Sequence, residues 1–140
     1  MKIGILYGSH RRNRQGIRVV EFMKKLVEKK GHDYVVIDSK ERNFPVLDKM
    51  YKEYENGGAP KFMEMTSNDL KDCEAFILVA GEYNNSLQPG LKNMIDHFQE
   101  EYFFKPTGLV SYSTGGFGGV RSAIQWRIVM SELGSVTLPT

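Results

Sequence analysis

The chain contains 140 residues, a length that favours a single domain. Nineteen lysines and arginines against seventeen aspartates and glutamates give a formal net charge of +2, too small for the field expected of a nucleic-acid-binding protein. The single cysteine, Cys73, excludes an internal disulfide and a multi-cysteine zinc site. No apolar run approaches the ~20 residues that a membrane-spanning helix needs. These features favour a reducing, cytoplasmic compartment and neither a nucleic-acid nor a membrane partner.

Short apolar runs alternate with helical patterns along the chain. Five runs predict β-strands, and the third is apolar throughout, which is typical of a strand buried on both faces of a parallel sheet. Between them, apolar residues recurring every three or four positions predict four helices, and residues 39–60 predict a long loop. The predicted strands are Lys2–Tyr7, Tyr34–Ile37, Ala75–Ala80, Gly108–Tyr112 and Val136–Leu138, and the predicted helices are Gly16–Lys30, Lys61–Lys71, Leu87–Tyr102 and Val120–Leu133.

This alternation implies a doubly wound α/β fold. Five strands favour a flavodoxin-like parallel sheet of order 2-1-3-4-5, with helices on both faces, over the dinucleotide-binding order. In such a sheet, ligands bind beyond the carboxyl ends of the strands, where strands 1 and 3 meet. We therefore expect the loops after Tyr7, Ala80 and Tyr112 to share one crevice.

The first of these loops, Gly8–Gly16, carries three arginines within four residues. Arg11, Arg12 and Arg14 offer charge and forked donors, and a turn from strand to helix adds free backbone N–H groups. Neither the Walker pattern nor G-x-G-x-x-G is present. The loop predicts a phosphate site, with a solvated basic loop as the alternative.

The other two loops offer different chemistry. After the third strand, Tyr83 supplies a flat surface with a polar tip, Asn84 adds neutral donors and acceptors, and Ser86 is placed to cap the next helix. After the fourth strand, Ser113–Arg121 has four glycines in five positions around Phe117, which indicates close backbone approach to a ligand. Together the loops match a ligand with a phosphate at one end and a flat, hydrogen-bonding ring at the other, such as FMN.

Three motifs in these loops resemble the NADPH-dependent FMN reductase family, which includes related quinone, azo-dye and chromate reductases. They are G-S-x-R-x-x-R-x-G from Gly8, E-Y-N-x-S from Glu82 followed by L-K-N-x-x-D from Leu91, and G-G-x-G-G-x-R from Gly115. The resemblance implies one flavodoxin-like FMN-binding domain over residues 1–140 that forms a homodimer or homotetramer. It implies that the cofactor is bound by Ser9, Arg11, Arg14, Gln15, Gly16, Ile17, Glu82, Tyr83, Asn84, Ser86, Ser113, Gly115, Gly116 and Phe117.

The activity that this resemblance implies is FMN-dependent oxidation of NAD(P)H as co-substrate, with a small acceptor such as a quinone, free flavin, azo dye or metal oxyanion. The flavin would supply the chemistry, so no side chain is assigned as catalytic, and no grouping in the sequence has metal-ligand spacing. One alternative is a flavodoxin-like electron carrier or sensor that binds FMN without turning over nicotinamide. Another is a non-flavin module that uses the basic loop for nucleic acid.

The chain departs from the family pattern at two places. The family usually has proline at the position of Gly81, and it usually continues past the fifth strand into a last helix, whereas this sequence stops at Thr140. We expect one face of the sheet to lack its cover unless further chain or a partner subunit supplies it. By resemblance, the helix from Leu87 and the loop near Tyr51 and Tyr54 are candidates for a subunit interface.

Residues outside the three loops have simpler interpretations. Cys73 precedes a buried strand and is expected to be a small apolar filler, and Trp126 is expected to be a packing residue. His97 follows Asp96 on a predicted helix and is expected at the surface. His10 could assist the phosphate or face water, and the sequence leaves both open.

Overall fold

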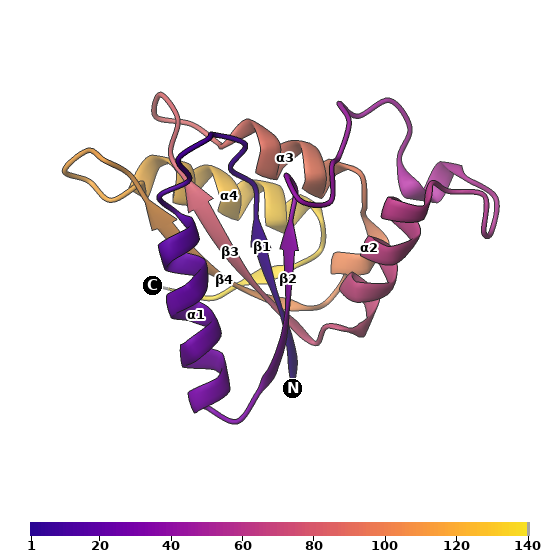
Figure 1. Ribbon diagram of the computed structural model, residues 1–140, viewed down its shortest axis with the longest axis horizontal. Helices are drawn as coiled ribbons and strands as arrows, with labels where there is room; N and C mark the ends of the chain where they lie inside the picture. The colour runs from indigo at the N-terminus through magenta and orange to yellow at the C-terminus, as the bar shows by residue number, and fades with distance from the viewer. Residues whose placement is uncertain (140) are drawn as a thin grey trace.

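The computed structural model describes residues 1–139 and shows a five-stranded parallel sheet with helices on both faces (Figure 1). The strand order is β2-β1-β3-β4-β5, which confirms the flavodoxin-like order expected from the sequence. The strands are β1 (Lys2–Tyr7), β2 (Asp33–Asp38), β3 (Ala75–Gly81), β4 (Pro106–Tyr112) and β5 (Val136–Thr137). The helices are α1 (Ile17–Lys29), α2 (Lys61–Asp72), α3 (Pro89–Asp96) and α4 (Val120–Glu132), with short 3₁₀ turns η1 (Tyr51–Glu53) and η2 (Glu100–Tyr102).

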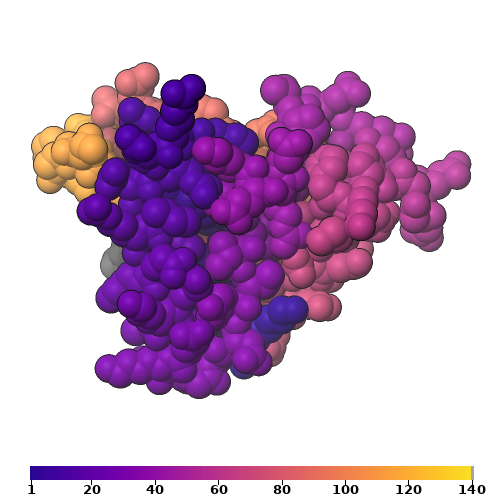
Figure 2. All heavy atoms as spheres, in the orientation of Figure 1, coloured from indigo at the N-terminus to yellow at the C-terminus, as the bar shows by residue number. Residues whose placement is uncertain are grey.

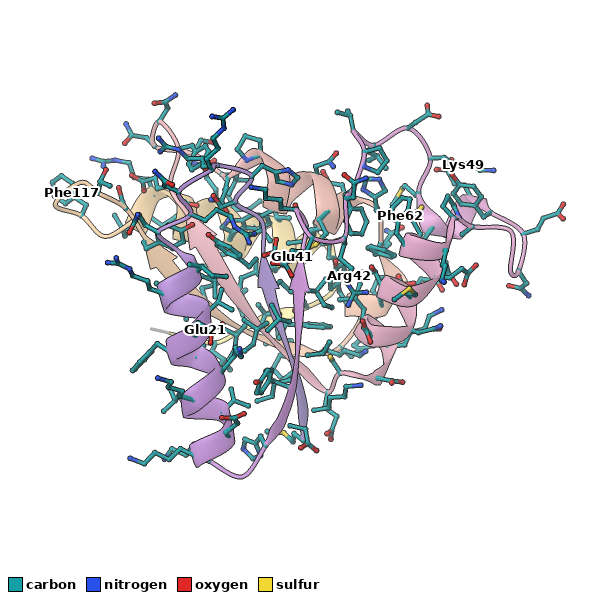
Figure 3. The ribbon with its side chains drawn as sticks, in the orientation of Figure 1. Glu21, Glu41, Arg42, Lys49, Phe62 and Phe117 are labelled. Carbon is teal, nitrogen blue, oxygen red and sulfur yellow. The ribbon has the colours of Figure 1, made fainter. Side chains whose placement is uncertain are left out.

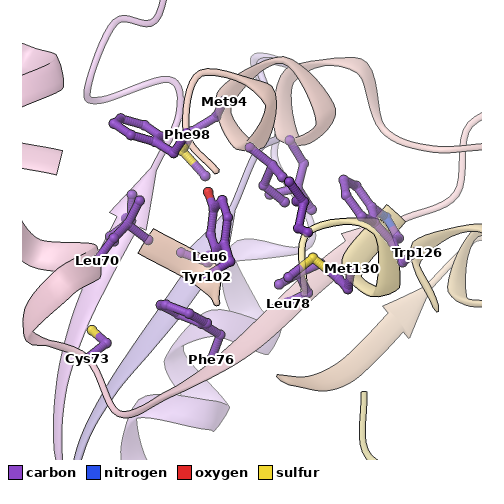
Figure 4. Close-up of a cluster of buried hydrophobic side chains, with 14 of the residues drawn as sticks. Leu6, Leu70, Cys73, Phe76, Leu78, Met94, Phe98, Tyr102, Trp126 and Met130 are labelled. Atoms are coloured by element: carbon purple, nitrogen blue, oxygen red, sulfur yellow. The ribbon is translucent and has the colours of Figure 1, made fainter. Parts of the chain in front are cut away.

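Two hydrophobic clusters hold the helices to the two faces of the sheet. Because alternate residues of a strand point to opposite faces, Leu6 enters one cluster while Ile5 and Tyr7 enter the other. The larger cluster joins the sheet to α2, α3 and α4 and includes the fully buried Trp126 (Figure 4). The smaller cluster lies under α1, where Val20 packs on the sheet. Burial of Trp126 confirms its expected packing role.

The helix predicted over Leu87–Tyr102 is longer than the helix in the structure, α3. Helix α3 ends at Asp96, and the backbone leaves helical geometry at Gln99, with φ −145° and ψ −66°. Phe98 and Tyr102 lie beyond this break and are still buried in the larger cluster. The apolar spacing therefore records which residues face the core, while the backbone that carries them changes from α-helix to a separate 3₁₀ turn.

The prediction that His97 lies at the surface is wrong. The residue is 2% exposed, its ring centroid lies 4.9 Å from that of Phe44, and its Nδ1 lies 2.7 Å from the carbonyl oxygen of Asn93. The chain turns inward directly after α3, which places the imidazole among aromatic side chains. Cys73 is buried as expected, and this burial raises the pKa of its thiol to about 11, as suits an inert packing residue.

The apolar face of α3 is used inside the chain. Leu91, Met94 and Ile95 are each at most 1% exposed and belong to the larger cluster. Tyr51 and Tyr54, the other candidates for a subunit interface, are half-buried and pack against the same cluster. The apolar face of α3, a candidate for a subunit interface by resemblance, is therefore buried within the chain.

Close contact between β1 and α3 places the first loop over the carboxyl edge of the sheet. A Cβ atom on Gly8 would lie 2.2 Å from the backbone of Leu91, and one on Gly90 would lie 2.4 Å from the carbonyl oxygen of Gly8. Only glycine allows this approach. Among residues 1–139, none of the helices combines the length and the apolar character that crossing a bilayer requires.

Candidate functional site

The loops after β1, β3 and β4 meet at the carboxyl edge of the sheet and line two adjoining cavities of about 660 and 190 Å³. We call these the large cavity and the small cavity. Figure 2 shows the first loop in indigo and the third in orange gathered at one end of the molecule. The volumes suit a small-molecule ligand, whose pockets usually measure about 300–1,000 Å³. The two cavities form one pocket, because both are lined by Arg11, Glu82, Tyr83, Ser113 and Thr114.

The small cavity is rich in hydrogen-bond donors. Ser9, Arg11 and Gln15 line it, together with Asn13, which the sequence did not single out. Within the described part of the chain, the backbone N–H groups of residues 11–16 donate no hydrogen bond. A run of free N–H groups before a helix, beside a hydroxyl and a guanidinium, is suited to a phosphate. Ser9, Arg11 and Gln15, which the sequence predicts to bind a phosphate, therefore lie together in this cavity.

Arg14 turns away from the pocket. Its guanidinium forms an ion pair with Asp38, which is 2% exposed at the end of β2, and a second hydrogen bond of 3.2 Å to Glu41. Partial burial acts to lower the pKa of Arg14, but the hydrogen bond and the charge of Asp38 outweigh it and raise that pKa. Arg14 therefore ties the first loop to β2, which leaves only its backbone N–H for the predicted phosphate contact. The neighbouring His10 is exposed, and its Nε2 lies 2.6 Å from Oγ of Ser39.

Gly16 and Ile17 support the small cavity without lining it. A Cβ atom on Gly16 would lie 2.3 Å from the phenol oxygen of Tyr112, so the start of α1 packs directly on that ring. Tyr112 is the last residue of β4, lines the small cavity and accepts a 3.2 Å hydrogen bond from Nε2 of Gln88. Burial raises the pKa of Tyr112 above its usual value, so its side chain remains a neutral hydroxyl.

Tyr112 also explains the glycine at position 81. A Cβ atom on Gly81 would lie 2.7 Å from the amide nitrogen of Gln88 and 2.9 Å from the Tyr112 ring. The space that a larger residue would need is filled by these two side chains. Tyr112 was not among the predicted site residues, although its place as the last residue of a strand in this sheet is a signal that could have found it.

Glu82 joins the second loop to α4. Its Oε2 accepts hydrogen bonds of 3.0 and 3.2 Å from the backbone N–H groups of Arg121 and Ser122, in the first turn of α4. The N-cap residue of that helix, Gly119, has no side chain to do this. Glu82 therefore caps α4 from another loop, which fixes the second loop against the third.

The prediction that Ser86 caps α3 is wrong, since Gln88 is the N-cap residue of that helix. Ser86 instead donates a 2.8 Å hydrogen bond from Oγ to Oε1 of Gln125 on α4. Nε2 of Gln125 in turn donates to the carbonyl oxygen of Asn85 over 2.8 Å. A polar residue just before a helix predicts a cap, but here the hydroxyl group bonds to α4, and α3 has no side-chain cap.

Tyr83 forms part of the wall of both cavities, and its hydroxyl lies 3.4 Å from Oγ of Ser9. The backbone N–H and C=O groups of Tyr83 and Ser86 pair with each other over 3.1 and 2.9 Å. Between them, Asn84 and Asn85 take positive φ values of 49° and 62°, a conformation that asparagine tolerates better than most residues. This tight turn presents both asparagines to the large cavity.

The third loop closes the large cavity with Ser113, Gly115 and Phe117. Oγ of Ser113 accepts a 3.1 Å hydrogen bond from the N–H of Gly115. Phe117 is 72% exposed and projects from the tip of the loop (Figure 3), with the guanidinium carbon of Arg121 5.0 Å from its ring centroid. Arg121 also lines the cavity, and it ends the third sequence motif but was not predicted as a site residue.

The structure brings most of the predicted site residues into one pocket, though not all of them. Among residues 1–139, no grouping of histidine, cysteine, aspartate or glutamate is suited to hold a metal ion. The predicted residues that line the pocket are Ser9, Arg11, Gln15, Glu82, Tyr83, Asn84, Ser113, Gly115 and Phe117, and those that do not line it are Arg14, Gly16, Ile17, Ser86 and Gly116.

The fold and this pocket define a flavodoxin-like α/β protein with a cavity at the switch point of its sheet. Residues 1–140 match the family described as NADPH-dependent FMN reductase, and the chain belongs to that family. It is 27% identical over 125 residues to an NAD(P)H-dependent FMN reductase of a Nectria species, covering 82% of this chain and 61% of that protein. It is 35% identical over 80 residues to a probable NADPH:quinone oxidoreductase of Oryza sativa subsp. japonica, covering 55% of this chain and 40% of that protein.

A solved structure shares the fold over almost the whole chain. It is the flavoenzyme NAD(P)H:(acceptor) oxidoreductase from Paracoccus denitrificans, with a TM-score of 0.82 at 18% identity, covering 99% of this chain and 75% of that one. This chain spans about three fifths of the Nectria relative and two fifths of the rice relative.

The ion pair of Arg14 gives a testable prediction. Replacing Arg14 with glutamine leaves Asp38 buried without its cationic partner, so we expect the free energy of unfolding to fall by about 3 kcal/mol in urea denaturation. Arg12→Gln is the matched control, because Arg12 lies in the same loop, is exposed and has no ion pair among the described residues. Equal unfolding midpoints for the two variants would contradict the structural role of Arg14.

Proposed function

We propose that the protein binds FMN in this pocket and acts as an NAD(P)H-dependent oxidoreductase with a small acceptor such as a quinone, free flavin, azo dye or metal oxyanion. The observation that carries the proposal is the joining of a donor-rich small cavity to a larger cavity with an aromatic and amide wall. When bound, FMN supplies the electron-transfer chemistry, from nicotinamide to acceptor. Family membership and the named relatives support this reading.

The small cavity has the groups that the phosphate of FMN requires. Among the described residues, the guanidinium of Arg11 pairs with no carboxylate, so its charge is free for a ligand. The hydroxyl of Ser9 and the free N–H groups of Arg11, Asn13 and Gln15, which line the same cavity, add donors around it. Among the described residues, Glu82 is the one carboxylate that lines the cavity, and one of its oxygens accepts hydrogen bonds from the first turn of α4. This donor set fits a phosphate.

The large cavity has the groups that a flat heterocycle requires. Tyr83 gives an apolar surface, and the amides of Asn84 and Asn85 give donors and acceptors at its edge. In the third loop, the N–H group of Phe117, which lines this cavity, donates no hydrogen bond within the described residues. Fixed backbone donors of this kind stabilise negative charge that develops on a bound ring. No side chain needs to act as a nucleophile or a general base.

The proposal also covers the compartment and the oligomeric state of the protein. We place it in the cytoplasm as a homodimer or homotetramer, in line with its single buried thiol and with the resemblance of its motifs to the reductase family. Nothing in the pocket is specific to one acceptor, so the acceptor is proposed only as a class.

Arg11 provides the direct test of cofactor binding. A hydrogen bond to a charged group contributes about 1.5–3 kcal/mol, so we expect Arg11→Gln to raise the dissociation constant of FMN by roughly 10- to 100-fold in a fluorescence-quenching titration. Arg12→Gln should leave the constant within about twofold, because Arg12 lines neither cavity. An unchanged affinity in Arg11→Gln would show that the phosphate binds elsewhere.

Steady-state turnover separates the reductase from a flavodoxin-like carrier that binds FMN alone. We expect the FMN-loaded protein to oxidise NADPH continuously with a soluble quinone, measured as loss of nicotinamide absorbance. The arginines of the first loop and the net charge of +2 favour the reductase over a carrier. Tight FMN binding with no NADPH oxidation above a protein-free FMN control would favour the carrier.

A further inference from the structure

The large cavity carries a positive charge that the phosphate end does not use. Arg121 lines the large cavity but not the small one, whereas Arg11 lines both. Among the described residues Arg121 forms no ion pair, in contrast with Arg14 and Arg42, which are held by Asp38 and Asp69. A guanidinium that faces a pocket without a carboxylate partner is available to an anionic ligand.

The N-terminus of α4 does not supply this anion site. Its first N–H groups, those of Arg121 and Ser122, already donate to Oε2 of Glu82. The carboxylate of Glu82 therefore offsets the positive end of the helix. The group left to bind an anion at this wall of the pocket is the guanidinium of Arg121.

Phe117 contacts that guanidinium, and both residues line the large cavity. The guanidinium carbon of Arg121 lies 5.0 Å from the ring centroid of Phe117, which is the range of a cation–π contact. Between the two residues, Gly118 and Gly119 have positive φ values of 61° and 85°, a conformation that favours glycine. The cation–π contact leaves the guanidinium without a carboxylate partner among the described residues, so its N–H groups are available to an oxyanion.

We propose that Arg121, in cation–π contact with Phe117, binds a negatively charged oxygen group of the second substrate. The inference rests on the proposed function, in which the phosphate of FMN lies in the small cavity beside Arg11. The pocket then holds two anions, one at each end. The second is a phosphate group of the nicotinamide dinucleotide or the oxyanion of an acidic acceptor, and the two sources share the chemistry that Arg121 recognises.

The test compares Arg121→Gln with the parent protein, both loaded with FMN. Glutamine keeps the backbone N–H that Glu82 accepts, so the cap of α4 is retained. Three quantities are measured: the dissociation constant of NADP⁺ by calorimetry, the KM for NADPH, and the KM values for a neutral and a sulfonated quinone. Arg12→Gln is the control for loss of one surface charge.

A dinucleotide source predicts that Arg121→Gln raises the NADP⁺ dissociation constant and the KM for NADPH at least tenfold, with both quinones unaffected. An acidic acceptor predicts a tenfold rise in KM for the sulfonated quinone alone. In either case the FMN dissociation constant stays within twofold, and Phe117→Leu gives a smaller change in the same direction. The inference is overturned if no quantity changes more than twofold relative to Arg12→Gln.

FMN affinity distinguishes the failure of this inference from the failure of the proposed function. If Arg121→Gln releases FMN while the parent protein binds it, Arg121 belongs to the cofactor site and the inference is wrong, but the proposed function stands. If the parent protein does not bind FMN at excess cofactor, both are wrong.

Discussion

The three loops of the pocket all pack against one residue, Tyr112. Each loop contributes a glycine to this contact: a Cβ atom on Gly16 would lie 2.3 Å from the Tyr112 phenol oxygen, one on Gly81 2.9 Å from its ring, and one on Gly119 2.8 Å from its carbonyl oxygen. Side chains at these positions would force the loops apart. The order of the sheet makes the arrangement possible, because it sets β1, β3 and β4 side by side with their carboxyl ends together.

The charged residues near the pocket divide into structural and free groups. Arg14 forms an ion pair with Asp38, and Glu82 accepts hydrogen bonds from the first turn of α4. The charge of each side chain is therefore neutralised by a contact that holds a loop in place. Arg11 and Arg121 have no carboxylate partner among the described residues and both face the pocket. A near-neutral chain can thus present local positive charge at one edge of its sheet, where an anionic ligand meets it with little competition from the rest of the surface.

Most of the fold could be predicted from the sequence because apolar residues that face the core recur with the period of a strand or a helix. The continuous apolar run of β3 and the alternating strands and helices specify a parallel sheet, and the observed order agrees. The same apolar spacing predicted too long a helix at α3, because Phe98 and Tyr102 are buried although the helix ends before them. Apolar spacing also gives no information on His97, whose burial depends on an aromatic partner distant in sequence.

The site was predicted less completely, for a related reason. Loop motifs indicate which residue types gather at the sheet edge, and Arg11, Tyr83 and Ser113 are there. They do not indicate which side chain faces the ligand, because that depends on partners from other loops. Arg14 is held outward by an aspartate on a different strand, and Ser86 by a glutamine on α4. Such contacts between distant segments follow from three-dimensional packing and have no local signal.

The most direct test of the account is the absorption spectrum of the FMN-loaded protein under anaerobic conditions before and after addition of NADPH. The account predicts that the protein retains FMN through gel filtration and that the flavin bands bleach on addition of NADPH. Flavin bands that persist, or a protein that emerges without flavin after incubation with excess FMN, would contradict it.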